Sequence, residues 1–186
     1  ASPFADDNKA PFLLTTTKQG WIKKTKLSLY NFSRRGITVT KVGEGDSLSW
    51  AQVGGGSNES IILGSRNGMA TRFSCDGGLR FTSRVSRGVR SMRLREGDEI
   101  AGVSVVSERD DDRWMLVISE RGFGKRVRCA DFRVQNRGGI GSIAIKFKRG
   151  EAARGDRMVC MTLVDEDSEV MLITNNGVIV RQQVKN

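Results

Sequence analysis

The residues with the clearest chemical potential lie in one short loop, Gln135–Gly141, which reads QNRGGIG. Its glycines carry no Cβ, so their backbone N–H groups can approach an anion closely. The arginine beside them can direct two N–H donors at one phosphate, and the glutamine can donate to the next phosphate. The alternative is that the glycines only turn a corner of the fold and the arginine is solvated. We favour phosphate binding, with Gln135, Arg137, Gly138, Gly139 and Gly141 as the contacts.

The overall charge favours a polyanionic partner. Lys and Arg total 31 against 21 Asp and Glu, which gives a formal net charge of +10. Arginine outnumbers lysine about two to one, and its planar guanidinium suits bidentate contacts to phosphate. Solubility alone would also explain an excess of charge. Because much of the excess lies in glycine-rich loops, we favour a nucleic acid.

Few residues could support catalysis or hold a metal. Histidine is absent, which removes the commonest general base and metal ligand. Cys75, Cys129 and Cys160 are far apart and form no CxxC pair, so they are expected to be reduced strand residues in a reducing compartment. Tyr30 is the only tyrosine, and nothing beside it resembles the active tyrosine of a strand-cleaving enzyme. We therefore expect no catalytic site, no metal site and no cofactor in this chain.

Nothing in the sequence directs the chain to a membrane. No apolar run approaches the ~20 residues of a membrane-spanning helix, and no signal-peptide pattern is present. We expect a soluble intracellular module. Residues 1–12 are expected to be a leader or the end of an upstream element, and residues 13–186 one domain.

Two registers of glycines recur along the chain with a period of roughly 50 residues, in the range of propeller-type arrays. The first register comprises turn glycines between two short apolar runs, and the second comprises glycines that end basic loops. The period predicts repeats near residues 13–57, 58–107, 108–164 and 165–186. The turn glycines are Gly20, Gly68, Gly122 and Gly177, and the loop glycines are Gly36, Gly88 and Gly141.

Short β-branched runs with turn residues between them predict an all-β chain. A four-stranded unit per period is typical of a propeller blade, which must bury its faces against neighbouring blades. The Gly-Asp pairs that close the repeats, Gly45–Asp46 and Gly97–Asp98, are expected to make turns rather than to bind metal. First strands should begin near Leu13, Ile61, Met115 and Val170, and later strands should cover Ile37–Val42, Val89–Leu94 and Ile143–Phe147.

Aromatic residues are assigned to the core. The three tryptophans fall on expected strands and should pack between blades, and three phenylalanines beyond the turn glycines should form a core layer. The residues concerned are Trp21, Trp50, Trp114, Phe32, Phe73 and Phe132.

Basic residues recur at fixed places in the repeat. The fourth residue beyond each turn glycine is basic, and the loops half a period further on are rich in arginine. If the blades stack in register, these residues form a continuous positive track on one part of the perimeter. The candidate DNA contacts outside the loop at 135–141 are Lys23, Lys24, Arg34, Arg35, Arg72, Arg84, Arg87, Arg90, Lys125, Arg126 and Arg181.

The repeat and its glycine-rich loop together resemble the C-terminal domain of the DNA gyrase A subunit, from about Leu13 to the end. Segments such as GWIKKT at Gly20–Thr25, GFGKR at Gly122–Arg126 and GVR at Gly88–Arg90 are typical of that family. The resemblance implies a β-pinwheel, a fold also used by topoisomerase IV, in which neighbouring blades exchange strands. It implies about three full blades and part of another.

The resemblance also implies a function. The family's domain is non-catalytic; it bends or wraps duplex DNA around a basic rim and presents a segment to the breakage-reunion core of an ATP-dependent type II topoisomerase. The implied partners are double-stranded DNA, the ATPase (B) subunit of gyrase, and the remainder of the gyrase A subunit. The implied location is the nucleoid in the cytoplasm, or an organelle of bacterial descent. Asn136 and Ile140 replace two basic residues of the family's box, so we expect weaker wrapping.

A second hypothesis is a propeller-like protein-interaction domain whose basic face binds an acidic partner. Salt dependence distinguishes the two, because wrapping over many phosphates makes affinity fall steeply with salt.

Overall fold

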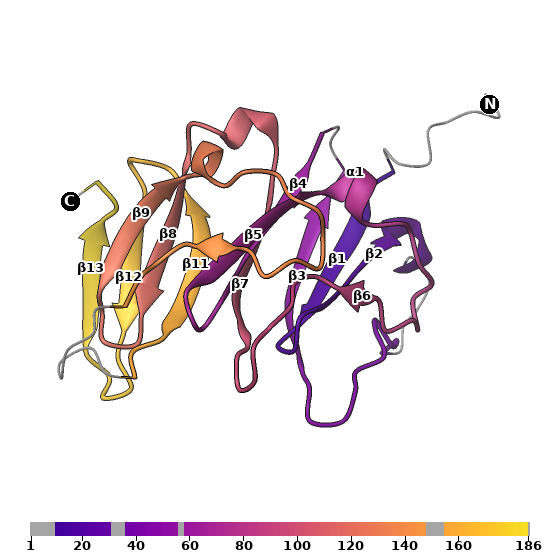
Figure 1. Cartoon of the computed structure of the whole chain (residues 1–186), viewed down its shortest axis with the longest axis horizontal. Coiled ribbons are helices and arrows are strands. Elements are labelled where there is room, and N and C mark those ends of the chain that lie inside the picture. The colour runs from indigo at the N-terminus through magenta and orange to yellow at the C-terminus, as the bar shows by residue number, and fades with distance from the viewer. Residues whose placement is uncertain (1–9, 31–35, 56–57, 148–154, 186) are drawn as a thin grey trace.

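The structure, a computed structural model, consists almost entirely of antiparallel strands, which confirms the all-β class. It describes residues 10–30, 36–55, 58–147 and 155–185. Four small sheets stand side by side in one row, with β1 in the sheet at one end and β13 in the sheet at the other (Figure 1). In the described ranges the one α-helix is a single turn, α1 (Cys75–Gly78). The sheets are the blades of the array.

The first blade combines strands from two repeats. β1 (Phe12–Thr17) and β2 (Trp21–Lys26) form a hairpin around a glycine turn, and β3 (Leu48–Gly54) pairs with the other edge of β1. The fourth strand, β6 (Val89–Arg90), comes from the following repeat and pairs with the start of β2. The strand order is therefore β3-β1-β2-β6.

The second blade repeats this arrangement. β4 (Ser60–Ser65) and β5 (Met69–Ser74) form the hairpin, and β7 (Ile100–Val106) pairs with β4. β10 (Ser142–Ile143) arrives from the third repeat and pairs with β5. The exchange of one strand between neighbours is thus present twice.

The third and fourth blades have fewer strands. The third consists of β8 (Trp114–Ser119), β9 (Gly124–Arg128) and β11 (Met158–Val164). The fourth is the hairpin of β12 (Glu169–Ile173) and β13 (Ile179–Gln183). The described residues therefore form two four-stranded blades, one of three strands and one of two, rather than three complete blades.

The exchanged strand brings the loop glycine of one repeat against the backbone of the repeat before it. Gly88 and Gly141 have φ values of +90° and +82°. A Cβ on either residue would lie 2.4 Å from a backbone carbonyl oxygen of the preceding blade, that of Ile22 or of Ala70. Only glycine satisfies both the positive φ and the close approach. The loop glycines therefore mark the places where adjacent blades are joined.

The strands expected after the loop glycines are shorter than predicted, or are not strands. Ile37–Val42 is irregular, and Thr40 donates a hydrogen bond to the Ser86 carbonyl instead of joining a ladder. Of Val89–Leu94 only the first two residues pair with a neighbour, because the chain then turns toward the third repeat, where the Arg93 N–H is donated to Gly139. The expected strand at residues 143–147 is likewise reduced to β10.

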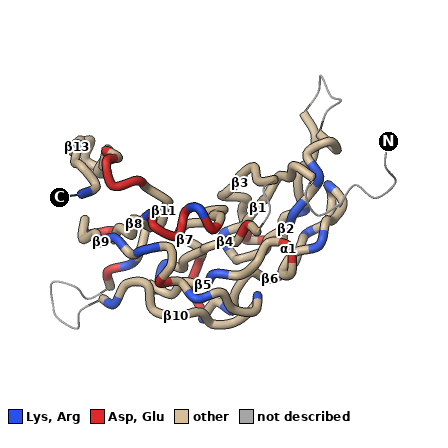
Figure 2. The backbone as a smooth tube through the Cα atoms, turned by 90° about the horizontal axis from the view of Figure 1, so that it is seen from above, with Lys and Arg blue, Asp and Glu red and all other residues tan. Residues whose placement is uncertain are grey.

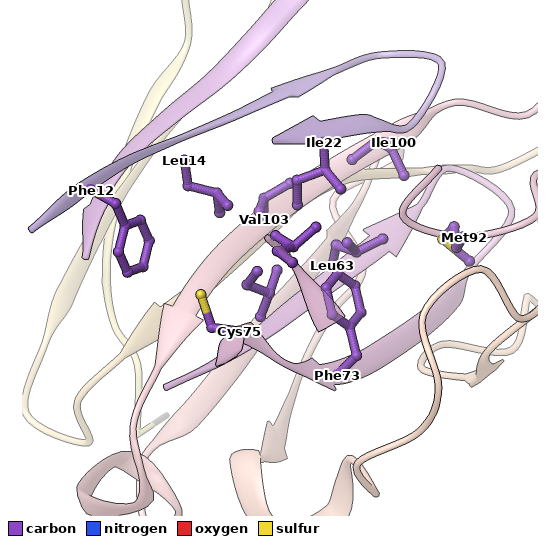
Figure 3. Close-up of a cluster of buried hydrophobic side chains, with 11 residues drawn as sticks. Phe12, Leu14, Ile22, Leu63, Phe73, Cys75, Met92, Ile100 and Val103 are labelled. Atoms are coloured by element: carbon purple, nitrogen blue, oxygen red, sulfur yellow. The ribbon is translucent and has the colours of Figure 1, made fainter. Parts of the chain in front are cut away.

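The hydrophobic core lies between the blades. Phe12 on β1 faces Leu63 and Phe73 of the second blade (Figure 3). Along β4 the side chains alternate, so that Ile61 joins this cluster and Ile62 joins the cluster shared with the third blade. β4 is consequently buried along its whole length, which explains why its apolar run is continuous rather than alternating.

The aromatic predictions hold for most of the described residues. Phe73 and Phe132 belong to the core, and Trp50 and Trp114 pack against its clusters. Phe32 lies outside the described residues.

Each Gly-Asp turn fastens the hairpin turn of its own blade. The Asp98 carboxylate accepts hydrogen bonds from the Asn67 N–H, at 3.0 Å, and from the Glu99 N–H, at 2.9 Å. Asp46 accepts from the Gln19 N–H, at 2.9 Å, in the same way. The prediction that these pairs make turns is confirmed, and the turns lead directly into β3 and β7.

Candidate nucleic-acid interface

The candidate contacts fall into three groups: buried inter-repeat cations, the loop that carries Arg84, Arg87 and Arg90, and the glycine-rich loop. Arg34 and Arg35 lie outside the described residues. The arrangement of the other candidates decides which of them can meet a phosphate.

Lys24 is wrong as a surface contact. Its side chain is fully buried, and its Nζ lies 3.2 Å from an oxygen of Asp76, on α1 of the next repeat. The same Nζ lies 4.9 Å and 4.6 Å from the ring centroids of Phe12 and Phe81. Burial raises the pKa of the neighbouring Cys75 thiol to about 11, although Lys24 opposes the shift. Lys24 is therefore an internal link between two repeats.

Arg72, at the equivalent place in the second repeat, is wrong as a contact for the same reason. Only 6% of its side chain is exposed. Its Nη1 lies 2.8 Å from Asp111 and 3.1 Å from the Cys129 carbonyl, both in the third repeat. The basic residue four places beyond the turn glycine thus pairs with the following repeat and is neutralised there.

Arg126 and Arg181 are less buried than Lys24 and Arg72, and of the two only Arg126 contacts the following repeat. Arg126 lies 3.9 Å from Glu166 of the fourth repeat and stacks on the Trp114 ring, 4.9 Å from its centroid. Arg181 is exposed and pairs with Glu169 of its own hairpin. Lys125 is exposed on β9 and remains a candidate contact. The charge of the two arginines is largely compensated by their acidic partners.

Lys23 is also buried, so it cannot touch DNA directly. Its Nζ donates to the carbonyls of Ser83 and Ser86, each at 3.2 Å, and to that of Arg84. Burial, followed by the nearby charge of Arg84, lowers the Lys23 pKa. The Lys23 side chain thus fixes the backbone of the loop at residues 83–86.

Arg87 and Arg90 are exposed and stack on Trp21. The guanidinium carbons lie 4.0 Å and 4.8 Å from the Trp21 ring centroid. Trp21 therefore supports arginine side chains, which corrects its assignment to packing between blades. Arg84 is half-buried in the same loop.

The structure differs most from the prediction at the glycine-rich loop, where expected phosphate donors are hydrogen-bonded within the protein. The Arg137 Nε donates to the Gly78 carbonyl at 2.9 Å, and its Nη1 donates to the Arg90 carbonyl. The Gly138 N–H is donated to the Ser91 carbonyl at 2.9 Å. Gly141 is at the close approach to Ala70, and Gln135, Asn136 and Ile140 are exposed while Gly139 is half-buried.

Figure 2 shows lysine and arginine positions on the side of the row that carries β5, β6 and β9, and others near β2, β11 and the C-terminus. Further exposed arginines that were not predicted as contacts include Arg80, Arg93 and Arg95. They belong to the acid-free run at residues 80–95, a signal that was readable in the sequence. In the ranges that the structure describes, no cluster of acidic or cysteine side chains could hold a metal ion, and no helix is long and apolar enough to cross a membrane.

One protein family accounts for this architecture. The family model described as DNA gyrase C-terminal domain, beta-propeller, matches residues 11–53, 59–107, 113–154 and 168–185. The chain belongs to this gyrase C-terminal domain family. The matched segments begin one residue before β1, β4, β8 and β12, respectively.

Relatives of the family cover the whole chain but extend well beyond it. The DNA gyrase A subunit of Synechocystis sp. is 37% identical over 100% of this chain, which spans 24% of that protein. The DNA gyrase A subunit of Staphylococcus epidermidis is 35% identical over 96% of the chain, which spans 19% of that protein. The chain thus corresponds to about a fifth to a quarter of these relatives.

Solved structures confirm the pinwheel-type fold. The structure of a DNA gyrase A C-terminal domain is 28% identical, with a TM-score of 0.80 over 95% of this chain and 57% of that one. The C-terminal domain of a DNA topoisomerase IV, at 22% identity, matches with a TM-score of 0.85 over 100% of this chain and 56% of that one.

Proposed function

We propose that this chain is a non-catalytic DNA-binding module of a type II topoisomerase, which holds and bends duplex DNA with its exposed basic residues. Its partners in this role are double-stranded DNA, the ATPase subunit of gyrase, and the remainder of a gyrase A subunit. It needs no cofactor, because side chains and backbone N–H groups make the phosphate contacts. It acts at the nucleoid in the cytoplasm, or in an organelle of bacterial descent.

The observation that carries this proposal is the set of exposed arginines at residues 80–95. In the described ranges, Arg80, Arg87, Arg90, Arg93 and Arg95 form no ion pair, unlike the buried cations between repeats. An uncompensated set of guanidinium groups attracts a polyanion and contacts its phosphates without reading its sequence. Membership of the gyrase family favours DNA over an acidic protein as that polyanion.

Binding to unrelated duplexes at several salt concentrations tests the proposal. We expect equal affinity for different sequences of the same length, higher affinity for longer duplexes, and a linear fall of log K with log salt. The slope should be about −0.9 for each phosphate contacted. Weak DNA binding that depends on neither length nor salt, together with tighter binding to polyglutamate, would overturn the proposal in favour of an acidic protein partner.

A further inference from the structure

The arginine loop, residues 80–95, contains six arginines and no acidic residue. In the described part of the chain none of the six forms an ion pair, and five are exposed. Elsewhere the arginines are often neutralised: Arg66 pairs with Glu99 and Glu120, and Arg113 pairs with Asp110 and Asp165. The charge of the arginine loop therefore remains available to an external anion.

Trp21, on β2 of the first blade, orients two of these arginines. The β2–β6 register places it opposite Arg90, and both Arg87 and Arg90 lie close to its ring centroid, at 4.0 Å and 4.8 Å. A guanidinium that stacks through its face still has its N–H edge available for a phosphate. Because the ring restricts both side chains before DNA arrives, less conformational entropy is lost on binding.

The backbone of the arginine loop is fixed from the same blade. The buried Lys23 ammonium donates to the carbonyls of Ser83 and Ser86, each at 3.2 Å. Thr40 donates to the Ser86 carbonyl as well, also at 3.2 Å. Two neighbouring residues of β2, Trp21 and Lys23 on either side of Ile22, thus support the loop through its side chains and its backbone.

In the glycine-rich loop at 135–141, by contrast, the hydrogen-bond donors of Arg137 and Gly138 bind backbone carbonyls of the protein. Two of the Arg137 nitrogens donate to the carbonyls of Gly78 and Arg90, and the Gly138 N–H is donated to Ser91. Ile140, which is 48% exposed, precedes its loop glycine at the place where Arg87 precedes Gly88. The principal polar groups of the glycine-rich loop therefore join the second and third repeats and leave few donors for DNA.

We propose that the arginine loop, oriented by Trp21, is the principal phosphate-binding surface of the described chain. The glycine-rich loop serves mainly as an inter-repeat brace whose Arg137 holds the backbone of Arg90. This inference rests on the proposed function and names which loop performs it and which residue positions it. Arg87 and Arg90 touch the phosphates, and Trp21 acts through them.

The test measures affinity for a fluorescein-labelled 40-base-pair duplex of mixed sequence across a salt series, for the wild-type chain and variants. Arg87→Gln with Arg90→Gln should reduce the steepness of the salt slope by about 1.8, since each lost phosphate contact removes about 0.9. Arg66→Gln with Arg113→Gln removes the same charge from arginines already paired with acids, and should change the slope much less. Arg137→Gln should lower the melting temperature but leave the slope nearly unchanged.

Trp21 is tested by two substitutions. Trp21→Leu removes the stacking ring and should weaken binding roughly three- to tenfold, whereas Trp21→Phe should restore most of the affinity. Thermal unfolding of each variant shows whether it folds. In a chain that also carries Trp50→Phe and Trp114→Phe, the fluorescence of Trp21 should change when the duplex is added.

The outcomes distinguish a failure of this inference from a failure of the proposed function. This inference is overturned if Trp21→Leu binds the duplex as tightly as the wild-type chain does. It is also overturned if Arg137→Gln reduces the salt slope more than Arg87→Gln with Arg90→Gln does. In either case the proposed function stands. Absence of salt-dependent duplex binding by the wild-type chain would overturn both.

Discussion

Two glycines of one loop, Gly138 and Gly141, share a backbone conformation but not an environment. Their φ values are +86° and +82°. A Cβ on Gly138 would meet nothing within 4 Å, whereas a Cβ on Gly141 would lie 2.4 Å from the Ala70 carbonyl oxygen. Substitutions at these two glycines therefore separate the free-energy cost of a left-handed backbone from that of a steric collision between blades.

We therefore expect Gly141→Ala to destabilise the chain more than Gly138→Ala. The latter should cost roughly 1–2 kcal/mol for the left-handed conformation alone, and the former should cost that amount plus the displacement of β10 from β5. Urea unfolding followed by far-ultraviolet circular dichroism measures both, and Gly138→Ala is the matched control. Equal losses would show that the blades are not held at this contact.

The residue scale also shows what the sequence leaves open. The periodic spacing of Lys24 and Arg72 was visible in the sequence, but the spacing of a charge does not reveal which way its side chain points. Asp76 and Asp111, the acids that bury these cations, lie in other repeats at irregular distances, so their pairing follows from tertiary structure alone. Gly88 and Gly141 were correctly predicted to recur at a fixed place in the repeat, but the close approach of each to the preceding blade also follows from tertiary structure alone.

At the scale of elements, the Gly-Asp turn links a hairpin turn to the start of the next strand of the blade. The Asp98 carboxylate fastens the β4–β5 turn at Asn67 to the start of β7. Asp98 is only 9% exposed, so water cannot readily take its place as the acceptor for these two N–H groups. The turn therefore fixes where the third strand of the blade begins.

Asp98→Ala should destabilise the second blade, because it leaves two N–H groups without their acceptor. The expected loss is roughly 1–3 kcal/mol of the free energy of unfolding. Asp98→Asn keeps an oxygen at the same position and should lose clearly less. Both are compared by the midpoint of urea unfolding, and an alanine variant as stable as the wild type would show that the turn does not stabilise the blade.

The same turns mark the limit of prediction for the elements. The first strand of each blade was placed within a residue or two, because β1, β4, β8 and β12 are short apolar runs just before a turn glycine. The bounds of β3, β7 and β11 were not predicted, although Trp50 was expected on a strand. Each of these strands follows a Gly-Asp turn, which the sequence pattern indicates as the end of a repeat. The reach of the exchanged strands depends on contacts such as that of Arg93 with Gly139, which no local pattern contains.

At the scale of the whole molecule, we expect the row of blades to bend DNA only as far as its exposed basic residues extend. Smooth bending of 20–30 base pairs costs on the order of 1–6 kcal/mol, which additional phosphate contacts must offset. The chain covers 57% of the gyrase A C-terminal domain structure that it resembles, and the exposed residues Asn136 and Ile140 of the glycine-rich loop carry no charge. The chain is therefore suited to binding more than to extensive wrapping.

We expect the isolated chain to trap little writhe when relaxed circular DNA is incubated with it and a nicking-closing topoisomerase. Asn136→Lys with Ile140→Arg should increase the trapped writhe, because both positions are exposed on the glycine-rich loop. Arg87→Gln with Arg90→Gln serves as the control for loss of contacts. Strong supercoiling of one hand by the unmodified chain would contradict this expectation.

Strand exchange has a mechanical consequence for a module of this kind. If Arg87 and Arg90 contact phosphates as proposed, a duplex under tension pulls on them, and the load enters β6, which hydrogen-bonds to β2 in the first blade while its chain continues into β7 of the second. The Arg90 carbonyl also accepts a hydrogen bond from Arg137 of the third repeat. A force applied at one loop is thus divided among three repeats. The first three blades cannot be pulled apart without breaking the pairing of an exchanged strand, β6 with β2 or β10 with β5.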